Sequence, residues 1–322
     1  MARGVPGPMM RDDRRKSVLF HRDFVQFSGG HLKVWHYFRH VAASASHEPA
    51  IYFTPRSRRD ETNPWHGAGT PFPERAEWNP AAADILFAAG LDWEAIPEQS
   101  RTPVVNLIQG MRHAAPDDPR HAFLSRRAVR ICVSEEVAEA VSATGRANGP
   151  VITIPNAIDD DVTAAAAAGR DIPLLLCGVK NPALADRLHD LIGRRGIGVV
   201  RQNEWMQRGE FLRLLGRAKV AVLLPCESEG CYLPALEAMA LGTLVVCPDC
   251  IGNRSFCRDG DNSFRPDYTA PAIEGAVLRA VALSAADHDR MVGRGMQQAR
   301  SRRLDEERRR FLAVLDEVPS LV

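Results

Sequence analysis

The chain has 322 residues, which favours two domains, because a single hydrophobic core rarely grows beyond about 250 residues. Hydrophobic residues make up 45% and charged residues 25% of the sequence, as in an ordinary globular protein. The net charge of +1 produces no strong overall field, so a nucleic-acid partner is not predicted. The sequence contains no apolar run of about 18 residues, so at most peripheral membrane contact is expected.

The N-terminal sixteen residues carry several charges and prolines, and no apolar segment follows them. We therefore interpret residues 1–16 as a disordered leader and not as a signal peptide. The seven cysteines are an odd number for disulfide pairing, and no secretion signal precedes them. Both features favour a cytoplasmic, reduced protein.

Short apolar runs alternate with amphipathic stretches in the first half, which is typical of βαβ units and a parallel sheet. Six strands are expected there, at Val18–Phe20, Ala50–Phe53, Asp84–Phe87, Val104–Ile108, Ile131–Val133 and Val151–Ile154. Helices are expected at Leu32–Ala43 and Glu135–Thr144. The segment Thr54–Pro80, rich in Pro, Gly, Asn and charge, predicts a long loop, and such loops tend to be functional or mobile.

The second half repeats the alternation after Asp159–Arg170, which we interpret as an interdomain linker, although its alanines could form a short helix. Four strands are expected, at Pro173–Cys177, Gly198–Val200, Val220–Leu224 and Thr243–Cys247. Helices are expected at Pro182–Arg194, Glu210–Arg217 and Pro234–Leu241. From Ala270 onward the chain is expected to be wholly helical, and its last helix to lie at about Ser301–Asp316. The predicted domains are residues 17–162 and 170–290, followed by C-terminal helices over 291–322. Two doubly wound units leave a cleft between their strand carboxyl ends, where such folds bind ligands.

The most informative segment lies between the third and fourth of these strands. A buried strand ends at Pro225, and an acidic loop containing Glu229 follows. A helix then begins at Leu233–Pro234, because proline suits the first helical turn. Glu237 lies three residues after the proline, and we place it in that first turn.

Two carboxylates therefore flank a helix N-terminus, and free backbone N–H groups are expected around Cys231–Ala235. Such an end carries partial positive charge and suits a phosphate. Gly230 permits a close approach of the backbone. Carboxylates beside a phosphate site are expected to face hydroxyls, so the ligand that fits best is a sugar nucleotide.

The segment resembles the donor-binding motif of the retaining GT-B glycosyltransferases of family 4, the glycosyl transferases group 1 type. That motif has an acidic residue and glycine, a short turn, Leu-Pro and a second glutamate eight positions after the first. Here it reads Glu229, Gly230, Leu233, Pro234 and Glu237. The resemblance implies that Glu229 lies by the donor hexose, that the turn Gly230–Leu233 holds the diphosphate, and that Glu237 holds the ribose hydroxyls.

One departure from the family is the pair Cys231–Tyr232, where Phe-Gly is usual. A tyrosine in place of the small residue is expected to fill space near the diphosphate or the hexose. We therefore expect Tyr232→Gly to change donor preference more than stability.

Other parts of the chain resemble the family more weakly. The stretch Val151–Asp159 is similar to the domain-junction motif. Gly29 and Gly30 resemble the N-terminal glycine loop that faces the diphosphate and the acceptor. The family's second domain opens with an Arg and a Lys for the diphosphate, and here Lys180 is the candidate. A family histidine that touches the donor sugar or β-phosphate would correspond to His113, whose alternative is a solvated loop residue.

Some of these residues also fit other interpretations. The two glutamates could merely cap the helix, since acidic residues favour a first turn. Cys247, Cys250 and Cys257 suggest zinc, but a structural site normally needs a fourth ligand. The arginines within 302–310 alternate with acidic residues, which indicates a solvated helix face. No G-x-G-x-x-G follows a strand, which disfavours a dinucleotide oxidoreductase.

The fold expected is α/β of the GT-B type: two Rossmann-like, doubly wound domains facing a cleft, with a C-terminal helix crossing back. The resemblance implies an acceptor in the first domain and a nucleotide sugar in the second. It implies a metal-independent, retaining transfer to a hydroxyl of a glycan, lipid-linked or small-molecule acceptor, as in polysaccharide or glycoconjugate biosynthesis, with no cofactor. The alternatives are another GT-B enzyme, such as a sugar phosphorylase, or a non-catalytic sugar-nucleotide-binding subunit.

Overall fold

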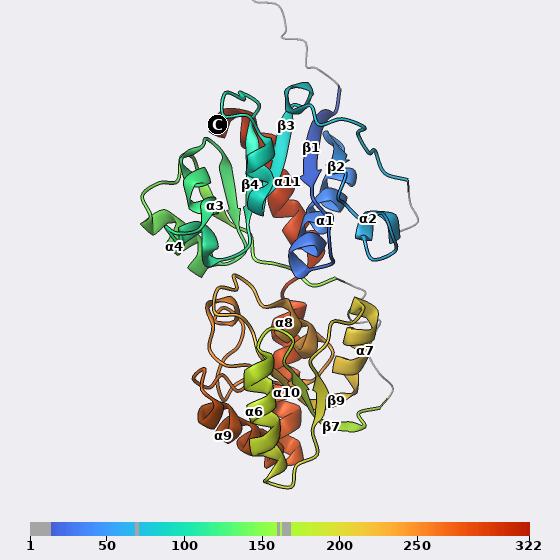
Figure 1. Ribbon diagram of the computed structural model, residues 1–322, viewed down its shortest axis with the longest axis vertical. Helices are drawn as coiled ribbons and strands as arrows, with labels where there is room; N and C mark the ends of the chain where they lie inside the picture. The colour runs from blue at the N-terminus through green and yellow to red at the C-terminus, as the bar shows by residue number, and fades with distance from the viewer. Residues whose placement is uncertain (1–13, 68–70, 160–161, 163–168) are drawn as a thin grey trace, which may run out of the picture.

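The computed structural model describes residues 14–67, 71–159, 162 and 169–322. Residues 1–13 of the expected leader and most of the expected linker, residues 160–161 and 163–168, lie outside this description. The chain forms two lobes, one above the other along the long axis of the molecule (Figure 1). Each lobe is built on its own parallel sheet.

The N-terminal lobe contains a six-stranded parallel sheet in the order β2-β1-β3-β4-β5-β6. Its strands are β1 (Lys16–Arg22), β2 (His47–Phe53), β3 (Ile85–Ala89), β4 (Val104–Ile108), β5 (Val129–Cys132) and β6 (Val151–Thr153). A strand is present at each of the six predicted places. The central strands β3 and β4 are buried along their whole length, as expected of parallel strands covered on both faces.

Four α-helices belong to this lobe: α1 (Gly29–Ala42), α2 (Pro64–Gly67), α3 (Pro119–Ala122) and α4 (Glu135–Ala143). Helix α1 begins three residues before the predicted start, because the Ser28 side chain accepts a hydrogen bond from the His31 N–H at 3.3 Å and caps the first turn. The segment predicted as one long loop after β2 contains α2. There the fully buried Trp65 packs edge-on against Trp35 at 5.2 Å and Phe53 at 5.5 Å.

The C-terminal lobe contains a four-stranded parallel sheet in the order β10-β9-β7-β8. Its strands are β7 (Ile172–Cys177), β8 (Val200–Gln202), β9 (Ala218–Leu223) and β10 (Leu244–Val246). Its helices, and those that follow it, are α6 (Pro182–Gly193), α7 (Arg208–Arg217), α8 (Leu233–Ala240), α9 (Ala270–Val281), α10 (Ala285–Arg300) and α11 (Leu304–Leu321). The four predicted strands are therefore present. In the described part of the chain, no helix is both long and apolar enough to cross a membrane.

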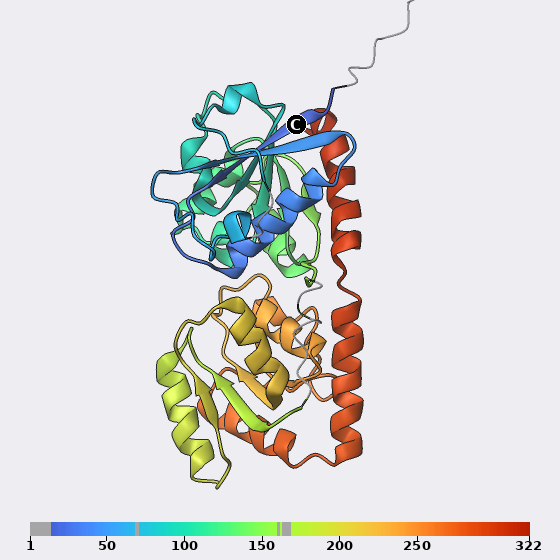
Figure 2. The ribbon, with the colours of Figure 1, turned by 90° about the vertical axis from the view of Figure 1, so that its right-hand side faces the viewer.

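The last two helices run along one side of both lobes (Figure 2). Helix α10 packs on α8 of the C-terminal lobe, and α11 packs on α1 of the N-terminal lobe, so the chain crosses back as predicted. The buried Glu307 of α11 accepts hydrogen bonds from the Lys33 ammonium at 2.6 and 2.8 Å, and its Oε1 lies 3.0 Å from His40 Nε2. Burial acts to raise the pKa of Glu307, but Lys33 and His40 lower it to about 2.

Candidate active site

A cleft of about 850 Å³ lies between the lobes. It is lined by the segments that follow β1, β3 and β4 in one sheet and β7, β8 and β9 in the other, as expected where two doubly wound sheets face each other. All but one of the predicted site residues line it: Gly29, Gly30, His113, Lys180, Glu229, Cys231, Tyr232, Leu233 and Glu237. Residues from distant parts of the chain therefore meet in one space.

Gly230 is the exception, and its expected role in the approach of the donor stays a prediction. A Cβ atom at Gly230 would lie 2.5 Å from the carbonyl oxygen of Gln109, in the other lobe. Next to it, the Met111 N–H donates to the Ser228 carbonyl at 3.2 Å. The glycine therefore permits the close contact of the two lobes at the end of the cleft.

The N-terminus of α8 differs from the prediction in two respects. Glu237 is the fifth residue of the helix, so it lies in the second turn and not in the first. Backbone N–H groups expected to be free are engaged: Tyr232 donates to the Gly252 carbonyl at 2.8 Å, and Leu233 donates to the Cys231 carbonyl at 3.1 Å. Fewer backbone N–H groups are therefore free to bind a phosphate than predicted. The N-cap residue is Tyr232, which makes no side-chain cap, so neither glutamate caps this helix.

Glu237 is buried at the wall of the cleft, with 6% of its surface exposed. Its Oε1 accepts a hydrogen bond from the Arg208 guanidinium at 2.7 Å. Burial raises the pKa of Glu237, and the charge of Arg208 opposes this shift. Among the described residues only one of the two carboxylate oxygens is engaged, so the other can accept a hydrogen bond from a ligand hydroxyl. The sequence did not indicate Arg208, because no motif marks the start of α7.

Glu229 forms an ion pair with Lys180 across the cleft floor. The Lys180 ammonium also lies 5.0 Å from the centre of the Tyr232 ring, within the range of a cation–π contact. Tyr232 is only 4% exposed and belongs to the hydrophobic core of the C-terminal lobe. The expectation that Tyr232→Gly spares stability therefore conflicts with its burial, since removing a buried aromatic ring typically costs about 3–5 kcal/mol.

His113 is not a solvated loop residue. It lies in a short 3-10 helix, Met111–Ala114, directly after β4, and it is 4% exposed. Neither of its ring nitrogens has a hydrogen-bond partner within the part of the chain that the structure describes. Burial, and then the charge of Arg120, lowers the pKa of His113 to about 4. Both nitrogens are themselves buried, so this neutral imidazole can accept from or donate to a ligand only where the ligand reaches them.

The N-terminal wall of the cleft contains further groups that sequence reasoning missed. Arg22, the last residue of β1, forms a buried ion pair with Asp92 of the 3-10 helix Gly90–Ala95, which follows β3. Gly29 packs against the opposite lobe, because a Cβ atom there would lie 3.6 Å from Leu233 Cδ1, an ordinary contact distance. The glycine loop and the start of α8 therefore face each other at one place.

The cysteines considered for zinc lie behind the cleft. Cys247 and Cys257 are fully buried, and Asn253 Nδ2 donates to Cys247 Sγ at 3.1 Å. Across the described residues, no group of three or more His, Cys, Asp or Glu side chains has an arrangement suited to a metal ion. The zinc interpretation therefore gains no geometric support.

A family model matches part of the chain. Residues 150–283 match the family model described as glycosyl transferases group 1. No curated protein matches the chain. The fold is similar to that of HepE from Anabaena, solved with UDP-glucose, at a TM-score of 0.73 and 12% identity, covering 94% of this chain and 100% of that one.

Two further solved structures show the same fold. Sucrose-phosphate synthase from Thermosynechococcus elongatus has a TM-score of 0.67 and 14% identity, covering 95% of this chain and 100% of that one. A glycosyltransferase from Rickettsia africae has a TM-score of 0.69 and 12% identity, covering 94% and 98%. The predicted GT-B fold is confirmed by these likenesses. Residues 150–283, set in this fold, form the domain that matches the glycosyl transferases group 1 family.

Proposed function

We propose that the protein transfers a sugar from a nucleoside-diphosphate sugar to a hydroxyl group, with retention of anomeric configuration and without a required metal ion. The observation that carries this proposal is the pair of glutamates, Glu229 and Glu237, each held beside a cation in one cleft. Glu237 has one oxygen available for the ribose hydroxyls, and Glu229 lies in the loop before α8, where the hexose would follow the diphosphate.

The diphosphate would lie between these two groups, at the N-terminus of α8. Lys180 would exchange its contact with Glu229 for the diphosphate and so neutralise charge that develops on the leaving group. The positive end of the α8 dipole would add to this stabilisation. Such electrostatic stabilisation can replace a metal ion, which is why we propose metal independence.

Retention follows in this proposal from transfer on one face of the donor sugar. The departing phosphate would take the proton of the acceptor hydroxyl, so no covalent nucleophile from the protein is assigned. His113, with two uncommitted ring nitrogens and a neutral ring at pH 7, would contact the hexose from the N-terminal lobe. The acceptor would enter from that lobe, between the glycine loop and the Arg22–Asp92 pair.

The donor is tested first by thermal shift with UDP-, GDP- and ADP-sugars in the presence of a chelator. One nucleoside diphosphate should raise the melting temperature, since a ligand at a hundred times its Kd stabilises a protein by about 2.7 kcal/mol. UDP-glucose is the natural first choice, because HepE was solved with it. A shift that vanishes with chelator would contradict metal independence.

Turnover is then tested by nucleotide release with and without candidate acceptors, and the anomeric configuration of the product is determined by NMR. Release of the nucleotide with product formation would support the enzyme. Tight donor binding with no release across the acceptors would favour a non-catalytic sugar-nucleotide-binding subunit. An inverted product would overturn the retaining mechanism while leaving the donor site intact.

A further inference from the structure

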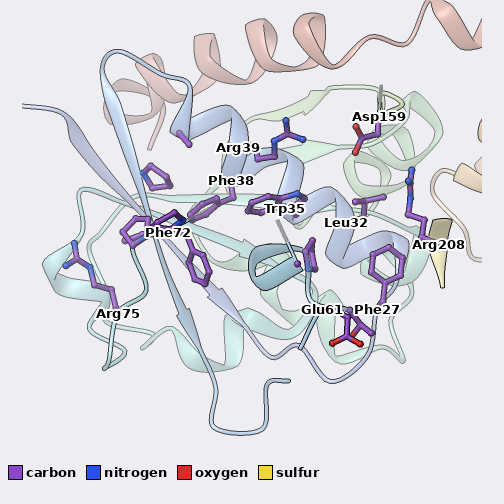
Figure 3. Close-up of a pocket in the computed structure, with 18 of the residues that line it drawn as sticks. Phe27, Leu32, Trp35, Phe38, Arg39, Glu61, Phe72, Arg75, Asp159 and Arg208 are labelled. Carbon is purple, nitrogen blue, oxygen red and sulfur yellow. The ribbon is translucent and has the colours of Figure 1, made fainter. Parts of the chain in front are cut away.

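A second hollow of about 1040 Å³ runs along the outer face of α1 (Figure 3). Its back wall consists of Trp35, Phe38 and Arg39, which lie on that face of the helix. Its opposite rim is formed by the segment after β2, with Phe72 and Arg75 at one end. We call this hollow the α1 groove. One of its sides comes from the segment that the sequence predicts to be a long loop, and none of the described cleft-lining residues comes from that segment.

The α1 groove opens into the cleft. Phe27, Leu32, Trp205 and Arg208 line both spaces. Away from the cleft, the groove follows α1 as far as Ala42. Ala42 lies ten residues after Leu32 on the helix, which is about 15 Å at a rise of 1.5 Å per residue. A ligand with one end in the cleft could therefore extend along α1 well beyond the length of one sugar ring.

The lining of the α1 groove alternates flat rings with hydrogen-bonding side chains. Trp35 and Phe38 stack at 5.8 Å with an interplanar angle of 17°, and Trp35 is half-buried. The exposed Arg39 and Arg75 have no ion-pair partner within the described residues, so their guanidinium donors are available to a ligand. Glu61 and Thr62 provide acceptors on the facing rim.

This composition distinguishes between two kinds of elongated ligand. An acyl chain is best enclosed by branched aliphatic side chains, and Leu32 is the one such residue in the described lining of the groove. A pyranose ring instead presents an apolar C–H face and an edge of hydroxyl groups. That combination matches aromatic faces flanked by guanidinium, carboxylate and hydroxyl groups.

We propose that the α1 groove binds an oligosaccharide, namely the part of the acceptor that is remote from the reacting hydroxyl. The inference rests on the proposed function, because the reducing or non-reducing end of this glycan must reach the donor in the cleft. It names the acceptor class: a chain of several sugar units, which the protein should bind in preference to a monosaccharide or a disaccharide.

The test uses hexasaccharides and disaccharides of glucose, N-acetylglucosamine and galacturonic acid, titrated calorimetrically into full-length protein saturated with UDP. At least one hexasaccharide should bind about tenfold more tightly than its disaccharide. Trp35→Ala should weaken that binding about tenfold, since an aromatic contact contributes on this scale. Arg39→Ala should weaken it severalfold. Arg187→Ala, an exposed arginine on α6, is the matched control and should leave it unchanged.

The variants keep the test decisive even if one of them misfolds. Trp35 packs on Trp65, so Trp35→Ala can disturb the fold. If it does, Arg39→Ala carries the test, because the Arg39 side chain is exposed. The inference is overturned if no hexasaccharide binds, if binding survives both substitutions, or if dodecyl phosphate occupies the groove instead. UDP binding without glycan binding would contradict this inference alone. Failure of the wild-type protein to bind UDP would contradict the proposed function.

Discussion

Replacing Glu237 by glutamine tests the assignment of the nucleotide end of the cleft. The substitution keeps the volume of the side chain and removes its charge beside Arg208. If the uncommitted oxygen of Glu237 accepts a hydrogen bond from a ribose hydroxyl, the variant keeps an amide acceptor but loses the charge assistance of that bond, about 1 kcal/mol. That corresponds to roughly fivefold weaker binding of free UDP. Isothermal titration calorimetry measures this change directly.

Stability should also decrease in this variant, because Arg208 loses its carboxylate partner. Breaking a fully buried ion pair costs about 3–5 kcal/mol. The Arg208 side chain is 19% exposed, so water compensates part of the loss and a smaller change is expected. Urea unfolding measures the change in the free energy of unfolding, and calorimetry measures the change in UDP affinity. The two measurements together separate donor binding from packing.

Glu229→Gln is the crossed partner of this experiment. Its predicted contact is the hexose and not the nucleotide, so kcat should fall strongly. UDP affinity should stay equal or rise, because the substitution releases Lys180 from its ion pair and frees it for the diphosphate. Glu227→Gln is the matched control, since Glu227 is exposed on the same loop.

The result that would refute the reasoning is symmetrical behaviour. If Glu237→Gln and Glu229→Gln both lower thermal stability and both leave UDP affinity at the wild-type value, the glutamates serve the fold and not the donor. A loss of UDP affinity confined to Glu229→Gln would instead reverse the proposed orientation of the donor in the cleft.

Tyr232→Gly should lower the free energy of unfolding in urea by about 3–5 kcal/mol, because the ring is buried, whereas Tyr232→Phe should change it little. Gly230→Ala should reduce kcat, because the added methyl forces the Gln109 carbonyl away and so separates the lobes. Gly193→Ala is the control, since its added methyl meets nothing within 4 Å. Equal kcat values for the two variants would exclude a functional role for the contact between Gly230 and Gln109. Burial lowers the pKa of His113 to about 4, so the unfolded state takes up its proton first as the pH falls from 6.5 to 4, and stability decreases with falling pH. His113→Asn should flatten that decrease by up to about 1.4 kcal/mol per pH unit, and an unchanged slope would count against a buried neutral His113.

The strands were predictable because parallel strands buried on both faces must be nearly continuous apolar runs. The first and last residues of the strands were less predictable, because hydrogen bonding to the neighbouring strand determines where each strand begins and ends. The prediction placed one edge strand at Gly198–Val200, whereas β8 occupies Val200–Gln202, where Gln202 pairs with Cys177 of β7. A three-residue strand in an edge position carries too few apolar side chains to fix its own register.

The candidate site was predictable only where it is local in sequence. The motif around Glu229 and Glu237 lies within one loop and one helix, so spacing alone brings its residues to the same end of α8. The partners that the structure adds come from elsewhere: Arg208 from α7, and Gln109 from the other lobe. Such contacts depend on how the two sheets pack, which no local pattern encodes.

The two departures from the family motif are connected in the structure. The resemblance leads to an expected Arg and Lys for the diphosphate, and only Lys180 is present after β7. The tyrosine that replaces the usual small residue lies under that lysine, and the negative face of its ring stabilises the ammonium group. Glu229 holds the same ammonium from the other side. We propose that Lys180 leaves Glu229 for the diphosphate while its ammonium group stays over the Tyr232 ring. In this proposal Tyr232 helps to position the one cation that is present, and this positioning would compensate for the missing arginine.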